Sequence, residues 1–304
     1  MLYPAELRDP ELLLSHNTRA LGQSEAYRWG MGEAAEARRP AVAGWFYPEA
    51  RDRLREAVDA LCEAAEPPSP SQAAPKGFLV PHAGYAYSGP VAASAYARIT
   101  PEEGGIRRVV VLGPSHRVPF RGIALPDTAA FDTPLGRIPL DESGIDAIRR
   151  LPEVQVLPAA HAQEHAIEVQ LPFLQRRLGP FALLPLVVGE ADPEVVAEVL
   201  EALWGGPETR FLISSDLSHY LPYDQARRQD QRTCAAIADL GPLREPNQAC
   251  GAIPLNAWMR SARHHGLEPR LLDLRNSGDT GGDRDRVVGY ASFAFEDAGG
   301  SHGA

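Results

Sequence analysis

A chain of 304 residues with 44% hydrophobic residues can bury a sizeable core, either as one large α/β domain or as two smaller ones. Its net charge of −10 argues against nucleic-acid binding, and it has neither a run of about 18 apolar residues nor a signal-peptide core, so we expect no membrane association. The three cysteines are far apart and form no CxxC pair, which favours a reducing compartment and a cytoplasmic location.

The convincing apolar pattern begins only near residue 38. Residues 1–37 have weak periodicity and mixed charge, so they are either an N-terminal extension that packs on a surface or the product of a wrongly assigned start. The folded domain is expected over residues 38–296. The glycine-rich end, residues 297–304, is expected to be a disordered tail.

Helices and strands alternate along the folded part. The spacing of Leu54, Val58 and Cys62 predicts an amphipathic helix over 49–64 with Cys62 in the core. The proline-rich segment 67–76 cannot be helical. Beyond it we expect strands at 77–80, 107–112, 122–125, 181–189, 211–215, 270–274 and 287–295, and a hairpin or extended loop at 131–141. Helices are expected at 91–99, 146–151, 161–178, 193–204, 223–240 and 252–263, and a turn at 276–285. Pro172 must kink or restart the helix over 161–178. This alternation predicts a single α/β domain with a central, mostly parallel or mixed sheet flanked by helices.

Three of the apolar runs end in a turn that is followed by a histidine: His82, His116 and His219. In an open α/β sheet, ligands collect at the carboxyl ends of the strands. Neutral imidazole is a common ligand of iron, zinc and copper. A lone histidine is more often a hydrogen-bonded core or surface residue, but this shared context predicts that the three converge on one metal site.

Two further residues could belong to that site. Cys250 precedes a predicted helix, whose N-terminus would favour a thiolate, as would a metal ion. The alternative for Cys250 is an inert buried cysteine. Asp216 lies three residues before His219, where it would either orient a histidine or cap a helix.

The segment HAQEH, residues 161–165, fits the H-x-x-E-H pattern of inverted zinc proteases. A match this short arises often by chance, and prolines on both sides leave room only for a short helix. We favour a version in which His165 and Glu168 line the pocket and His161 is incidental. The alternative is the polar first turn of a helix.

The chain resembles the Memo family, also called AmmeMemoRadiSam system protein B. The resemblance rests on stretches that occur in the family's order over about residues 38–296. They are RRPAVAGWFYP, VPHAGYAYSGPVAASAYARI, VVVLGPSHRVPFRG, TPLG, HAQEHAIEVQLPFLQ, ISSDLSHYLPYD, ACG and NSGDTGGDRDRVVGYASFAF. Ala166 stands where the family usually has serine.

The resemblance implies a fold like that of the class III extradiol ring-cleaving dioxygenases, which bind non-haem iron. It implies His82, His116 and Cys250 as metal ligands, with His219 beside them and Asp216 and His165 in or near the same pocket. Iron(II) is the first expectation for the metal, with copper or zinc as alternatives. A small-molecule substrate of unknown identity would bind there, and AMMECR-type and radical-SAM proteins are implied as partners.

Three functions follow from these features. In a metal-dependent oxidoreductase, His219 would act as the acid/base on a substrate hydroxyl, assisted by Asp216 and His165. A thiolate in place of the usual carboxylate of the oxygenase triad leaves catechol cleavage open. A zinc hydrolase would instead activate a bound water. In a binding module, Arg117, Arg121 and Arg284 would hold an anion.

Overall fold

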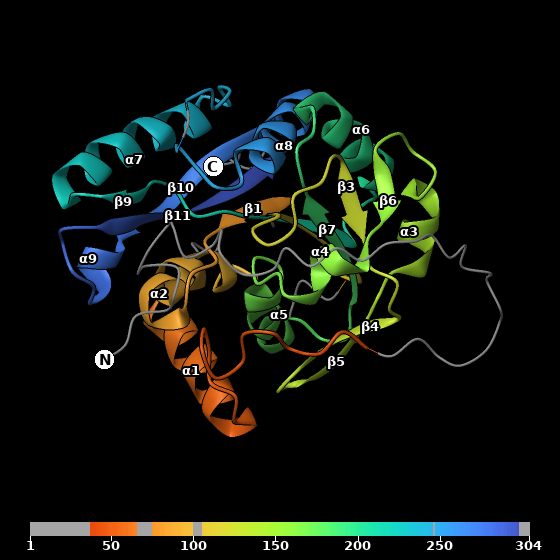
Figure 1. Ribbon diagram of the computed structural model, residues 1–304, viewed down its shortest axis with the longest axis horizontal. Helices are drawn as coiled ribbons and strands as arrows, with labels where there is room; N and C mark the ends of the chain where they lie inside the picture. Colours follow the sequence, from red (N-terminus) through yellow and green to blue (C-terminus); the bar gives the residue numbers. More distant parts are fainter. Residues whose placement is uncertain (1–36, 66–74, 100–104, 246, 298–304) are drawn as a thin grey trace, which may run out of the picture.

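The computed structural model of the protein describes residues 37–65, 75–99, 105–245 and 247–297 (Figure 1). The expected N-terminal extension and tail lie almost entirely outside these residues. None of the helices in the described ranges combines the length and the apolar character that crossing a bilayer requires.

Eleven strands occur in the described part of the chain. They are β1 (Gly77–Val80), β2 (Arg108–Pro114), β3 (Ile123–Leu125), β4 (Ala130–Thr133), β5 (Gly136–Pro139), β6 (Val154–Val156), β7 (Ala182–Val188), β8 (Thr209–Ser214), β9 (His219–Leu221), β10 (Leu267–Asn276) and β11 (Val287–Asp297). β4 and β5 form the hairpin that was expected over 131–141.

The other nine described strands form one central sheet in the order β10-β11-β1-β8-β2-β7-β3-β6, with β9 paired to β11 (Figure 1). β1, β8, β2 and β7 are parallel neighbours. β11 is antiparallel to both β1 and β10, and β3 is antiparallel to β7. The prediction of a single α/β domain with a mixed sheet is therefore confirmed.

Helices cover both faces of this sheet. They are α1 (Arg51–Ala64), α2 (Tyr85–Tyr96), α3 (Glu142–Ile148), α4 (Pro158–Ala162), α5 (Leu171–Arg177), α6 (Pro193–Leu203), α7 (Tyr223–Ala238), α8 (Ala252–His264) and the short α9 (Ser277–Thr280). Figure 1 shows α1, α2 and α5 on one side of the sheet and α6, α7 and α8 on the other.

The alternation of side chains along β2 explains its unbroken apolar sequence. Val109 and Val111 pack into the core on the side of α1, α2 and α5. Val110 and Leu112 pack into the core on the side of α6, α7 and α8. A strand whose two faces are both covered needs apolar residues at every position, and all four side chains are fully buried.

The helix expected over residues 161–178, with a kink or a new start at Pro172, is confirmed only in that new start. The segment divides into α4, a 3-10 turn at Glu168–Gln170 and α5. Pro172 lies in the first turn of α5, where proline begins a helix but cannot continue one. Between α4 and the 3-10 turn, the carboxylate of Glu164 accepts hydrogen bonds from the backbone N–H groups of His165 and Ala166, so these amides do not need a helical partner.

The expected turn over 276–285 also differs, because it contains α9. The side chain of Asn276 accepts from the backbone of this short helix, and the carboxylate of Asp279 accepts from the Asn276 N–H at 3.0 Å. This reciprocal pair is a capping box, which stabilises a helix start even in a glycine-rich segment.

Glu168 lies in the core and not in the pocket, so its expected position is wrong. Its side chain is fully buried and forms an ion pair with the guanidinium of Arg38. It also accepts from the backbone N–H groups of Ala41 at 2.7 Å and Val42 at 3.0 Å, and from the Tyr47 hydroxyl at 2.5 Å. One carboxylate therefore fixes the first described segment of the chain onto the domain.

We expect Glu168→Ala to lower the free energy of unfolding by about 3–5 kcal/mol, because it leaves the Arg38 guanidinium buried without its counter-charge. Urea titration followed by circular dichroism measures this loss. The matched control is Glu190→Ala, which removes an exposed partner of Arg121 at 3.8 Å and should cost no more than about 1 kcal/mol. Equal losses for the two variants would contradict the role of Glu168.

Candidate metal centre

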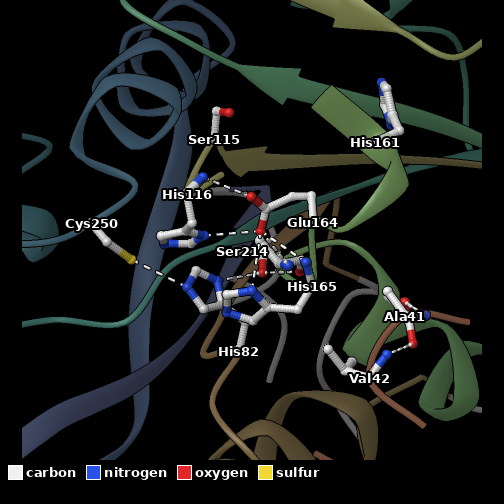
Figure 2. Close-up of polar contacts among 12 residues, drawn as sticks. Ala41, Val42, His82, Ser115, His116, His161, Glu164, His165, Ser214 and Cys250 are labelled. Carbon is white, nitrogen blue, oxygen red and sulfur yellow. Dashed lines mark hydrogen bonds and ion pairs between the residues drawn. The ribbon is translucent and has the colours of Figure 1, made fainter. Parts of the chain in front are cut away.

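Three predicted ligands lie together at one edge of the sheet. The ligand atoms of His82, His116 and Cys250 are all within 4.8 Å of one another. The Nε2 atom of His82 is 3.3 Å from the Cys250 sulfur (Figure 2). His82 is buried, whereas the side chain of His116 is 26% exposed, so the cluster reaches the surface on the His116 side.

The parallel strands bring the two histidines to the same edge. β8 lies between β1 and β2 and is parallel to both. His82 follows the end of β1 by two residues, and His116 follows the end of β2 by two residues. Of the three histidines expected to converge, two lie together: the ring centroids of His82 and His116 are 5.1 Å apart. His219 belongs to no described group of potential metal ligands.

Cys250 joins them because its backbone is bound to the end of β8. Its N–H donates to the Asp216 carbonyl at 3.2 Å, and the Gly251 N–H donates to the Ser215 hydroxyl at 2.8 Å. A Cβ atom at Gly251 would lie 2.8 Å from the Ser215 Cβ, closer than such atoms approach. Glycine at 251 is therefore what allows Cys250 to come this close to β8.

Hydrogen bonding determines the tautomer of His82. The Ser214 hydroxyl has one proton, which it donates to the Ala166 carbonyl at 2.6 Å. It must therefore accept from its other two partners, which are the Gln170 amide nitrogen and His82 Nδ1, both at 2.9 Å. Nδ1 of His82 thus carries a proton, and Nε2 is the nitrogen that faces the Cys250 sulfur.

His116 is held in the same manner by a carboxylate. Its Nδ1 lies 2.9 Å from Glu164 Oε1, and its backbone N–H donates to Glu164 Oε2 at 2.7 Å. The Glu164 side chain is almost fully buried. A carboxylate behind a ligating histidine sets the ring orientation and raises its basicity. Both Nδ1 atoms are therefore occupied, and both Nε2 atoms are available to one central point.

The charges of the cluster favour an anionic sulfur. Burial raises the pKa of Cys250, but the charge of His82 and hydrogen bonds from His116 and His82 outweigh it and lower the pKa to about 6. Burial lowers the pKa of His116, yet its hydrogen bonds to Cys250 and Glu164 raise it well above the usual value. Without a metal ion, a proton between His116 and Cys250 keeps these donors from repelling one another.

A metal ion fits this arrangement. Two imidazole nitrogens and a thiolate directed at one point are donors that divalent zinc, iron and copper accept. An ion would take the place of the proton shared by His116 and Cys250. The rings would not need to turn, because Ser214 and Glu164 already hold their Nδ1 atoms.

His165 lies against the two ligand rings, as the sequence suggested. Its ring centroid is 5.3 Å from that of His82 and 4.8 Å from that of His116 (Figure 2). Burial, and next the charge of His116, lower its pKa well below the usual value, so the ring is neutral. Its contacts are those of a residue that packs the ligand rings in place.

The other predicted residues have different positions. Asp216 accepts from the backbone N–H of His82 at 2.7 Å, so it fixes the chain that carries a ligand ring and not the ring itself. His219 is half-buried on β9 and does not belong to any of the described groups of potential metal ligands.

His161 lies outside the cluster (Figure 2). Its Nε2 atom donates to the Ala124 carbonyl at 2.9 Å, and burial lowers its pKa to about 4, so it is a neutral core residue. Because α4 ends at Ala162, His161 and His165 do not lie on one helical face. The H-x-x-E-H zinc site is therefore not formed.

A pocket of about 510 Å³ opens beside the cluster. Cys250 and Ser115 form part of its wall, and Val118, Phe120 and Ile253 make much of the rest apolar. A small molecule in this pocket would lie next to the sulfur.

Sequence reasoning missed the partners of the ligand rings. It considered Glu164 only as a protease base, and it did not consider Ser214 or Gln170. Gln170 is held by the Tyr96 hydroxyl, which donates to its amide oxygen at 2.8 Å. Ser214 ends the run that leads to His219, so a polar residue at the carboxyl end of a buried strand was the available signal.

Comparison with known proteins identifies the family to which the chain is similar. A family model described as "Memo-like protein" matches residues 38–294. A MEMO1 family protein of Aquifex aeolicus is 37% identical over 270 residues, covering 85% of this chain and 98% of the relative. One from Sulfolobus acidocaldarius is 35% identical over 281 residues, covering 85% and 99%. One from Methanosarcina barkeri is 35% identical over 273 residues, covering 85% and 100%.

We expect iodoacetamide to modify Cys250 selectively in the folded, metal-free protein. Its alkylation rate should rise with pH through about 6 and level off above, because the thiolate is the nucleophile. Burial raises the pKa of Cys62 to about 11 and that of Cys234 to about 12, so these two thiols serve as internal controls. Peptide mass spectrometry measures all three. A Cys250 rate that still rises between pH 7 and 9 would contradict the thiolate.

Proposed function

This chain belongs to the Memo family, and we propose that it is a metal-dependent oxidoreductase whose ion is held by His82, His116 and Cys250. The observation that carries the proposal is the convergence of their three ligand atoms within 4.8 Å, with Nδ1 of each ring already bound to Ser214 or Glu164. Rings prepared in this manner are typical of ligating histidines.

Iron(II) is the ion we propose first, and copper and zinc are the alternatives that the same donors accept. The choice of iron follows from the likeness of the family to the class III extradiol dioxygenases. Three protein ligands leave other coordination positions open, and a bound iron(II) ion would supply redox chemistry and room for dioxygen and a substrate oxygen.

Other residues around the proposed metal ion would have supporting roles. Glu164 and Ser214 orient the ligand rings, Asp216 holds the backbone of His82, and His165 packs against both rings. The resemblance to the Memo family would give His219, which lies on β9, the transfer of a proton from a substrate hydroxyl.

The substrate would occupy the 510 Å³ pocket beside Cys250. Its apolar wall of Val118, Phe120 and Ile253 suits an aromatic or other apolar ring. The Arg121 and Glu190 side chains at the rim are 3.8 Å apart and exposed, so they would contact only a polar group that extends out of the pocket. A catechol is the simplest probe with these properties.

We expect the metal-stripped protein to bind one iron(II) ion at this site under anaerobic conditions, and to consume dioxygen when a catechol is then added. Iron analysis after desalting and an oxygen electrode measure the two steps. Cys250→Ser should lose the iron, whereas Cys62→Ser, which changes a buried thiol elsewhere, should keep it. An iron-loaded protein that consumes no dioxygen would contradict the proposal that the protein is an oxidoreductase. Turnover of an ester substrate only in the zinc-loaded protein would favour a hydrolase.

Glu164→Gln should weaken iron binding at the cluster by about 10–100-fold, because the ring of His116 loses its carboxylate partner. Competition with a chelator of known affinity measures the change. Glu190→Gln, a change of the same kind on an exposed side chain, should leave the affinity unaltered. A Glu164→Gln variant that folds and binds iron as tightly as the wild type would show that the carboxylate does not support a ligand.

A further inference from the structure

A group of potential metal ligands that shares no residue with the Cys250 cluster lies at the far end of α8. It consists of Glu201 on α6, His264 in the last turn of α8 and His265, which ends that helix. One ligand atom from each is within 4.8 Å of the others. All three residues are exposed, so an ion could reach them directly from solvent.

Rigid neighbours hold one member of this group in place. The ring of His265 stacks on that of Trp204, with centroids 3.6 Å apart and planes at 8°. Trp204 in turn stacks on the fully buried Trp258 at 5.7 Å. The His265 Nε2 atom is 2.7 Å from Glu201 Oε2. His265 therefore has a fixed ring plane and already faces a carboxylate.

The surroundings of the group favour a cation. The carboxyl end of a helix carries partial negative charge, and His264 and His265 lie at that end of α8. Glu194 and Glu198 line the adjoining pocket of about 390 Å³ together with Glu201. Arg260 and Arg263 also line it, but Arg260 forms an ion pair with Glu194 at 3.1 Å and Arg263 donates to the Leu240 carbonyl.

We propose that Glu201, His264 and His265 form a second site, for a divalent transition-metal ion such as Zn²⁺, which clamps α6 to α8. Two imidazoles and a carboxylate are zinc ligands, and donors around a tetrahedral ion are spaced roughly 3.3 Å apart. The distance between His265 Nε2 and Glu201 Oε2 must increase by less than about 1 Å from its present 2.7 Å. The exposed side chain of His264 must rotate to bring its ligand nitrogen closer to them. Water completes the coordination.

The test uses the tag-free full chain, stripped of metal and dialysed against Zn²⁺. The wild type should hold two equivalents and Cys250→Ser one, because only the Cys250 cluster loses its ion. Cys250→Ser/His264→Ala and Cys250→Ser/Glu201→Gln should bind zinc at least tenfold more weakly than Cys250→Ser. Cys250→Ser/His302→Ala, the matched histidine control, should bind it unchanged. The Cys250→Ser background makes the result independent of the function proposed for the Cys250 cluster.

A second measurement reports the location of the ion. Cu²⁺ quenches nearby indole fluorescence, and Trp204 touches the His265 ring. Cu²⁺ should therefore quench Cys250→Ser, and much of that quenching should disappear in Cys250→Ser/Trp204→Phe. Zn²⁺ should also raise the Tm of Cys250→Ser but not of the His264→Ala double variant. A Cys250→Ser protein that binds no zinc, or that keeps its zinc after His264→Ala, would overturn the proposal.

Discussion

The arrangement of His82 and Cys250 in the candidate metal site depends on hydrogen bonds to the carboxyl end of β8. The Ser214 hydroxyl accepts a hydrogen bond from the ring of His82, and the Ser215 hydroxyl accepts one from the Gly251 N–H. Asp216 accepts from the His82 N–H with its carboxylate and from the Cys250 N–H with its carbonyl. These three consecutive residues connect β1, β8 and α8, which are distant in the sequence. Because β8 lies in the middle of the parallel part of the sheet, its end cannot move without disturbing β1 and β2.

Two buried glutamates that are four residues apart in the chain, Glu164 and Glu168, balance positive charge inside the domain, and each serves a different purpose. Glu164 lies at the cluster, where its buried carboxylate offsets a positive His116. Glu168 lies one turn further, where it offsets Arg38 and binds the first described segment. A helix through both residues would have placed them on the same face. The break after Ala162 is what sends one into the site and the other into the core.

The strands and the clustering of His82 with His116 could be predicted from the sequence because both leave local patterns. Buried strands such as β2 require an apolar residue at every position, and the turn and histidine that follow mark the strand end. The partners of the ligand rings leave no such pattern. Ser214 and His82 are 132 residues apart in sequence, and Gln170 reaches Ser214 over 44 residues. Only the pairing of β1 with β8 brings them together, so no window of sequence could have identified them.

The same limit explains the error over residues 161–178. Helical periodicity predicted that the segment is helical from His161 onward, with a kink or a new start only at Pro172. The backbone instead exchanges helical hydrogen bonds for bonds to the Glu164 carboxylate, whose other oxygen binds the His116 amide. That exchange depends on a strand end about 48 residues away. A local rule was overridden by a tertiary contact at the site, where such exceptions are expected.

α8 connects the His82–His116–Cys250 cluster with the Glu201–His264–His265 group proposed as a second metal site. It has 13 residues and is therefore about 20 Å long. Its N-terminal end, next to Cys250, carries partial positive charge and favours a thiolate, whereas its carboxyl end, at His264 and His265, carries partial negative charge and favours a cation. The two proposed sites would therefore use opposite ends of one dipole. An ion that clamps α6 to the far end of α8 would also steady the helix whose first turn holds Cys250 beside His82.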